Sequence, residues 1–231
     1  KGATQIDGSL ARNADFMENS LVNYATRIDQ SFNARIADLD NPILQPWARE
    51  VIRKNNEIAL SGRPVPSPIM SCWPKGPTYF LLSPMTQPMY FVQGPKEIVM
   101  ILTSFNDVRH IYLTDKHSQN PTPSWYGESI GHYEGDTLVV DTIGIDTRTY
   151  VDNYFTPHTE KLHVVERFHM IDGGKTLEVN VRVEDPGAFT MPWNAIQRYH
   201  RVEPGVAENK DALNPISSSA VSARMRSRSG T

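Results

Sequence analysis

From about residue 89 onward, the chain alternates short runs of β-branched and aromatic residues with groups of turn-forming residues. The runs cover residues 90–93, 98–104, 108–114, 129–133, 137–143, 162–171, 176–184 and 193–202. Turn signals such as Gly94-Pro95 and Asp172-Gly173 separate them, so neighbouring runs are most simply joined as antiparallel hairpins. A meander of about eight strands tends to close on itself. The pattern therefore predicts a mainly β fold, with an antiparallel up-and-down barrel over residues 89–203.

Two stretches before this barrel have the spacing of amphipathic helices. In residues 14–34, Met17, Leu21, Tyr24 and Ile28 would stack on one helix face. A second helix is expected to begin at Pro46 and to end at Gly62. We therefore expect a single domain made of four segments: helical residues 1–62, a proline-rich extended crossing at 63–88, the barrel at 89–203 and a serine- and arginine-rich tail at 204–231.

The composition argues against several classes of protein. The formal net charge is −3 and charged residues make up 21% of the chain, which is unlike a protein that seeks nucleic acid. No apolar run approaches the roughly 18 residues that a membrane-spanning helix needs. Cys72 is the single cysteine, so it cannot form a disulfide within the chain. We expect a soluble protein without nucleic-acid partners or a membrane span.

Residues 123–142 carry a long and specific motif. They read Pro-Ser-Trp-Tyr-Gly-Glu-Ser-Ile-Gly-His-Tyr-Glu-Gly-Asp-Thr-Leu-Val-Val-Asp-Thr, and the likeness continues through residues 157–162, 165–168, 184–186 and 192–193. Over residues 95–195 the chain resembles a large family of small bacterial and fungal proteins, most of them exported and without an assigned activity. The resemblance implies a calycin-like barrel and export to the periplasm or the cell exterior, while a cytoplasmic location stays open.

Glu166 is the sharpest candidate for chemistry. In the strand at residues 162–171, alternation places Leu162, Val164, Glu166 and Phe168 on one face. A carboxylate in an apolar row costs several kcal/mol unless it is paired or protonated, and such a desolvated carboxylate suits general acid or base catalysis. The alternative is a satisfied ion pair in the core, for example with Arg109.

Other candidates lie near this strand. His158 and Glu160 precede it at the expected barrel mouth, where a histidine beside a carboxylate would be a general base, or else a loop cap or surface pair. In the strand at 108–114, Arg109 faces one side, and His110 and Tyr112 face the other. Arg109 turned inward would suit a carboxylate or phenolate, whereas His110 with Tyr112 would suit proton transfer. The alternation does not decide between them.

Several aromatic residues fall in or near the loops around these candidates. They would stack on an aromatic substrate, or else simply pack in the core: Trp125, Tyr126, Tyr133, Phe155 and Trp193. Asp141 is expected at a strand edge, with the pocket as a second option. No phosphate-binding glycine loop, Gly-x-Ser-x-Gly elbow or His-Glu-x-x-His pair is present, and the seven histidines include no His-x-His pair. We therefore expect no cofactor and no metal.

These residues favour a cofactor-independent lyase, dehydratase or isomerase that acts on a small hydrophobic, preferably aromatic, molecule in the barrel. Glu166 and His158 would move protons, while Arg109 and Tyr133 would stabilise developing negative charge. The competing hypothesis is a binding protein that holds a hydrophobic small molecule without chemistry. A third is a subunit whose barrel and basic C-terminal tail serve assembly into a homo-oligomer.

Overall fold

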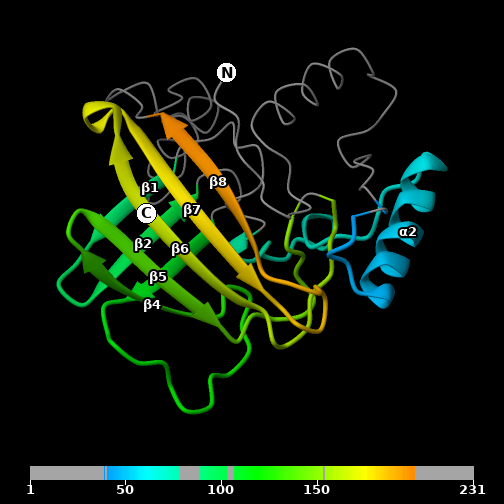
Figure 1. Cartoon of the computed structure of the whole chain (residues 1–231), viewed down its shortest axis with the longest axis horizontal. Helices are drawn as coiled ribbons and strands as arrows, with labels where there is room; N and C mark the ends of the chain where they lie inside the picture. The colour runs from blue at the N-terminus through cyan, green and yellow to red at the C-terminus, as the bar shows by residue number, and fades with distance from the viewer. Residues whose placement is uncertain (1–38, 40, 79–88, 103–106, 153, 201–231) are drawn as a thin grey trace, which may run out of the picture. The chain divides into compact units, whose positions relative to one another are not determined.

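Eight strands join in chain order into one curled sheet that forms a half-barrel (Figure 1). The computed structural model describes residues 39, 41–78, 89–102, 107–152 and 154–200. The strands are β1 (Met89–Gln93), β2 (Glu97–Leu102), β3 (Asp107–Tyr112), β4 (Glu128–Glu134), β5 (Thr137–Ile143), β6 (His163–Ile171), β7 (Thr176–Glu184) and β8 (Trp193–His200). The mainly β fold and the eight predicted strand positions are therefore confirmed.

The prediction of a fully antiparallel closed barrel is wrong in two respects. β3 and β4 pair in parallel through Tyr112 and Ile130, whereas every other neighbouring pair is antiparallel. Residues 113–127 connect β3 to β4, which is long enough for a crossover rather than a hairpin. Within the described strands, no ladder joins β1 to β8, so the sheet is mixed and open.

One α-helix lies within the described residues, α2 (Pro46–Leu60), and it confirms the second predicted helix. Pro46 occupies its first turn, where the missing N–H has no intrahelical partner to lose. Ala48, Ile52, Asn56 and Ala59 form its buried face. The helix predicted within residues 14–34 and the tail at 204–231 lie outside the described residues.

The concave face of the sheet carries the core. On β7, Val179, Val181 and Val183 are buried, while Arg182 points outward, as the alternation predicts. One end of this core is covered by α2 and by loop residues, because Ile52 and Phe189 belong to the same apolar cluster as Trp193 of β8. We call this the closed end.

Candidate functional site

A buried ion pair occupies the concave face of the sheet. Arg109 of β3 donates from Nη1 to Glu166 Oε1 of β6 at 2.8 Å and from Nη2 to Glu166 Oε2. Both side chains are 0% exposed to solvent. Of the two alternatives for Glu166, the structure has the core ion pair with Arg109. It also places Arg109 on the inner face, which the alternation alone left open.

Two hydroxyl groups complete the surroundings of the guanidinium. Arg109 donates to Ser129 Oγ at 3.1 and 3.2 Å and to Thr142 Oγ1 at 2.9 Å. The two hydroxyls are 3.0 Å apart, and both residues are buried. Tyr199 of β8 lies near Glu166: burial, then the negative charge of Glu166, raises the pKa of Tyr199. The Tyr199 phenol therefore stays protonated. Both oxygens of the Glu166 carboxylate accept hydrogen bonds from Arg109.

A second set of polar residues consists of Asp107 and Lys75, which are buried, and Tyr126, which is partly buried. Asp107 is at the start of β3, on the same face as Arg109. Burial raises the pKa of Asp107, an effect that Tyr126 and Lys75 partly oppose. Burial lowers the pKa of Lys75, partly against the attraction of Asp107. Sequence reasoning missed Lys75 and Asp107. Alternation along the strand could have predicted Asp107, because it lies two residues before Arg109 and so shares its face. Lys75 could not be predicted in this way, because it lies in a proline-rich segment without periodicity.

His158 is part of a tightly bonded loop and is not brought to Glu166. Its Nε2 lies 2.8 Å from Thr149 Oγ1 and its Nδ1 lies 2.9 Å from the Thr159 carbonyl oxygen. Burial lowers the pKa of His158. No hydrogen bond or ion pair joins His158 and Glu166 in the part of the chain that the structure describes. Glu160 is exposed. The geometry matches the loop-cap alternative more closely than a shared acid–base site.

The outer face of β3 carries the other two candidates from that strand. His110 and Tyr112 are exposed, with their rings stacked at 6.3 Å between centroids. His110 Nδ1 lies 2.9 Å from Glu97 Oε2 of the neighbouring strand. Because Arg109 points inward, both side chains lie on the opposite side of the sheet from Glu166.

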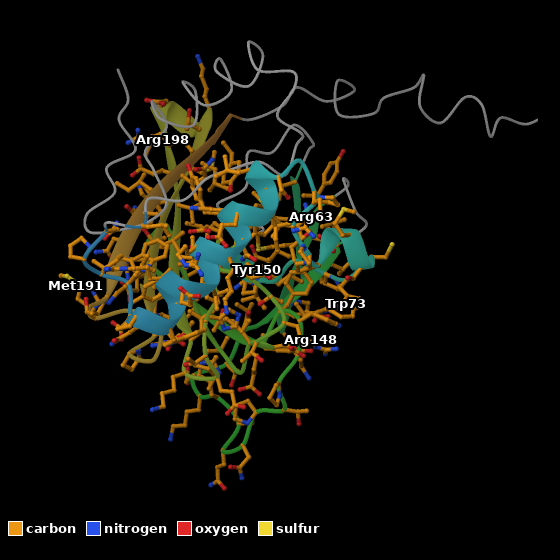
Figure 2. All side chains as sticks on the ribbon, turned by 90° about the vertical axis from the view of Figure 1, so that its right-hand side faces the viewer. Arg63, Trp73, Arg148, Tyr150, Met191 and Arg198 are labelled. Atoms are coloured by element: carbon orange, nitrogen blue, oxygen red, sulfur yellow. The ribbon has the colours of Figure 1, made fainter. Side chains whose placement is uncertain are left out.

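The remaining aromatic candidates fall in different places. Trp193 is in the main core, and Phe155 belongs to a separate buried cluster with Val65. Trp125 packs on Trp73 at 5.4 Å between ring centroids. The Arg148 guanidinium lies 4.2 Å from the Trp125 ring centroid, and Figure 2 shows Arg148 next to Trp73. These residues do not gather around Glu166.

The opposite end of the half-barrel from the closed end exposes residues of the concave face. Register places Phe91 opposite Met100 and Arg109, and Tyr133 opposite Leu138 and Phe168, so Phe91 and Tyr133 are on the concave face. Met170, two residues after Phe168 on β6, shares that face. Phe91, Tyr133 and Met170 are 38%, 48% and 45% exposed, respectively. We call this the open end.

Two contacts cross the open end. The Phe91 ring packs edge-on against Phe168 at 5.7 Å between centroids. The Tyr133 hydroxyl donates to Gln93 Oε1 of β1 at 2.9 Å. The open end thus combines apolar surface with a polar bridge at its rim.

Asp141 lies on the outer face of β5 and faces neither end. Its Oδ1 is 3.0 Å from His117 Nε2 and 2.9 Å from His163 Nε2. His117 was not a sequence candidate, because nothing local to its loop indicates which strand it meets. Among the described side chains, no group of three or more His, Cys, Asp or Glu residues is arranged to hold a metal ion.

None of the described helices has the length and apolar character needed to cross a membrane. Comparisons with known proteins add no identification. No family model matches the chain, and neither a curated protein nor a solved structure matches it. The family resemblance and the export that it implies therefore stay predictions.

Proposed function

We propose that the protein binds a small, largely apolar molecule, preferably an aromatic one, at the open end of the half-barrel, without changing it chemically. The observation that carries this proposal is the exposure of Phe91, Tyr133 and Met170, which belong to the otherwise buried concave face. Apolar surface that continues a core and reaches solvent in a concave region is typical of ligand sites.

The residues of the open end match such a ligand. An aromatic ring would contact Phe91 and Met170, which offer an aromatic face and a flexible thioether. Tyr133 and Gln93 at the rim would orient one polar group of the ligand. A ligand of about 20 heavy atoms at about 0.3 kcal/mol per atom would bind with about 6 kcal/mol, which corresponds to a dissociation constant of tens of micromolar.

The acid–base reaction is the weaker proposal. A general base must lie within reach of its substrate, but Glu166 is 0% exposed and both of its oxygens accept hydrogen bonds from Arg109. A reaction at this carboxylate would first have to separate a fully buried ion pair. His158, its proposed partner, is hydrogen-bonded within its own loop.

The experiment is a fluorescence titration with 1-anilinonaphthalene-8-sulfonate, an aromatic probe. We expect binding in the tens of micromolar range, and at least about tenfold weaker binding for the double variant Tyr133→Ser/Met170→Gln, which removes apolar surface from the open end. Met191→Gln is the matched control, because Met191 is exposed outside the strands (Figure 2). Unchanged affinity in the double variant would contradict the proposed site. Conversion of a bound aromatic ligand into a product would contradict binding without chemistry.

A further inference from the structure

The long connection between β3 and β4 carries a histidine held between two carboxylates. His117 Nδ1 lies 2.9 Å from Glu128 Oε1, and its Nε2 lies 3.0 Å from Asp141 Oδ1. A carboxylate only accepts hydrogen bonds, and a neutral imidazole has a proton on only one of its nitrogens. Both contacts can therefore be hydrogen bonds only when the His117 ring carries two protons and a positive charge.

The neighbouring strands extend this arrangement into a charge-balanced group. His163 Nε2 of β6 shares Asp141 Oδ1 at 2.9 Å, and Arg182 of β7 donates to Glu184 at 2.6 Å beside His163. The charged residues gathered here are Glu128, Asp141, Glu184, His117, His163 and Arg182. With both rings protonated, three positive charges face three negative ones. Loss of both ring protons leaves one positive charge against three, an excess of two negative charges.

The hydrogen bond from His163 to Asp141 supports the same direction of pH dependence. That bond raises the pKa of His163 above its ordinary value, although burial opposes it. A histidine whose pKa is raised on folding stabilises the structure at low pH, and this contribution is lost as the pH rises through the folded-state pKa. For Asp141, burial alone would raise the pKa, but the bonds from His163 and His117 outweigh it and hold the pKa below its usual range.

These contacts secure the middle of the connection to the outer face of the sheet. At its start, Leu113 N donates to the Lys96 carbonyl at 2.8 Å, and near its end Ser124 N donates to the Gly144 carbonyl at 3.0 Å. Between them, Ser118 N donates to Glu128 Oε1 at 2.8 Å, the same oxygen that His117 contacts. In Figure 1 the connection, drawn in green, projects beyond the edge of the sheet. Residues 117 and 118 thus join this projecting segment to β4 and β5.

We propose that His117 is a proton-dependent clamp. In its doubly protonated form it bridges Glu128 and Asp141 and holds residues 117 and 118 of the connection at the outer face of β4 and β5. When the ring loses a proton, one of the two bonds is lost, the nitrogen without a proton faces a carboxylate, and the segment is released. This clamp lies on the opposite face of the sheet from the open end and does not depend on ligand binding there.

The test is amide hydrogen exchange of the full chain across pH 5.5–8.5, corrected for intrinsic exchange. In the wild type, the protection of the Ser118 amide should fall by at least about tenfold as the pH rises. The reason is that one of the two charge-assisted hydrogen bonds of the neighbouring His117 is lost, which releases the segment that carries Ser118. In His117→Gln it should be low throughout, because glutamine has one donor nitrogen and one acceptor oxygen, whereas the imidazolium presents a donor nitrogen to each of the two carboxylates. The matched control is His132→Gln, since His132 of β4 contacts a carboxylate, Glu134, at 3.2 Å on the same face. It should keep the wild-type profile.

A pH-independent protection of Ser118 in the wild type, or the same loss in His132→Gln, would overturn the clamp. A second readout is the nitrogen NMR spectrum of the His117 ring. Two ring N–H groups should be present at low pH, where the segment is protected, and a single ring N–H with undiminished protection would also overturn it.

Discussion

Replacing Glu166 by glutamine would leave the charge of Arg109 buried without a counter-charge. Both side chains are 0% exposed, and the carboxylate takes two of the guanidinium's hydrogen bonds. Removing one member of a buried pair costs about 3–5 kcal/mol, because the other charge stays desolvated. Glutamine retains one oxygen acceptor but not the charge. We therefore expect Glu166→Gln to lower the free energy of unfolding by roughly 3–5 kcal/mol.

The assay is urea denaturation followed by circular dichroism, with Arg109→Met and the double variant Arg109→Met/Glu166→Leu measured alongside. At a denaturant slope of about 2 kcal/mol per M, the midpoint of Glu166→Gln should fall by about 1.5–2.5 M. In the double variant both charges are gone, and Ser129 and Thr142 keep their mutual hydrogen bond of 3.0 Å. Its stability should return to within about 2 kcal/mol of the wild type.

Two results would refute this account of the pair. A loss below about 1 kcal/mol for Glu166→Gln would show that the Arg109 charge is not desolvated in the folded protein. A double variant less stable than either single variant would show that the two residues are not coupled through their charges. Either result would restore Glu166 as a candidate for acid–base chemistry.

Two further predictions concern the backbone and a buried histidine. Gly127 has φ +65°, and a Cβ there would lie 2.4 Å from the Ile143 carbonyl oxygen, whereas Gly135 has φ +59° and no atom within 4 Å. In urea denaturation, Gly135→Ala should cost about 1–2 kcal/mol and Gly127→Ala at least about 2 kcal/mol more, so equal losses would contradict the contact. Because burial lowers the pKa of His158, its contribution to stability is present above its unfolded-state pKa of about 6.5 and is lost as the pH falls. Between pH 7.5 and 5, His158→Asn should therefore lose less stability than the wild type, and equal pH dependence would contradict this.

The strands were predictable because their signal is local. On β7, the valines alternate with polar residues, and such alternation fixes which side chains share a face whatever the neighbouring strand is. The parallel pairing of β3 with β4 was not predictable in this way. It depends on the path of residues 113–127, which meets β5 through contacts such as the one between His117 and Asp141, two residues that are distant in sequence.

The residues of the candidate site show the same difference between a local signal and contacts that are distant in sequence. Glu166 in an apolar row, with Arg109 as its alternative partner, follows from alternation on two strands. His158 was placed beside Glu166 because it precedes the same strand. Nearness in sequence does not fix where a loop side chain points, and its hydrogen bonds to Thr149 and Thr159 direct it elsewhere. Lys75 had no periodic signal at all.

The ion pair requires the sheet to curl between β3 and β6. β3 and β6 are three strand positions apart, which in a flat sheet would separate them by about 14 Å. For Arg109 and Glu166 to meet, the strands between them must bend toward the concave face. Ser129 of β4 and Thr142 of β5 face the guanidinium there, and their side chains are small enough to fit beneath it while donating or accepting hydrogen bonds. Larger side chains at these two positions would hold β3 and β6 apart, so the short hydroxyl residues between the flanking strands are what allow the long charged pair to meet across the curved sheet.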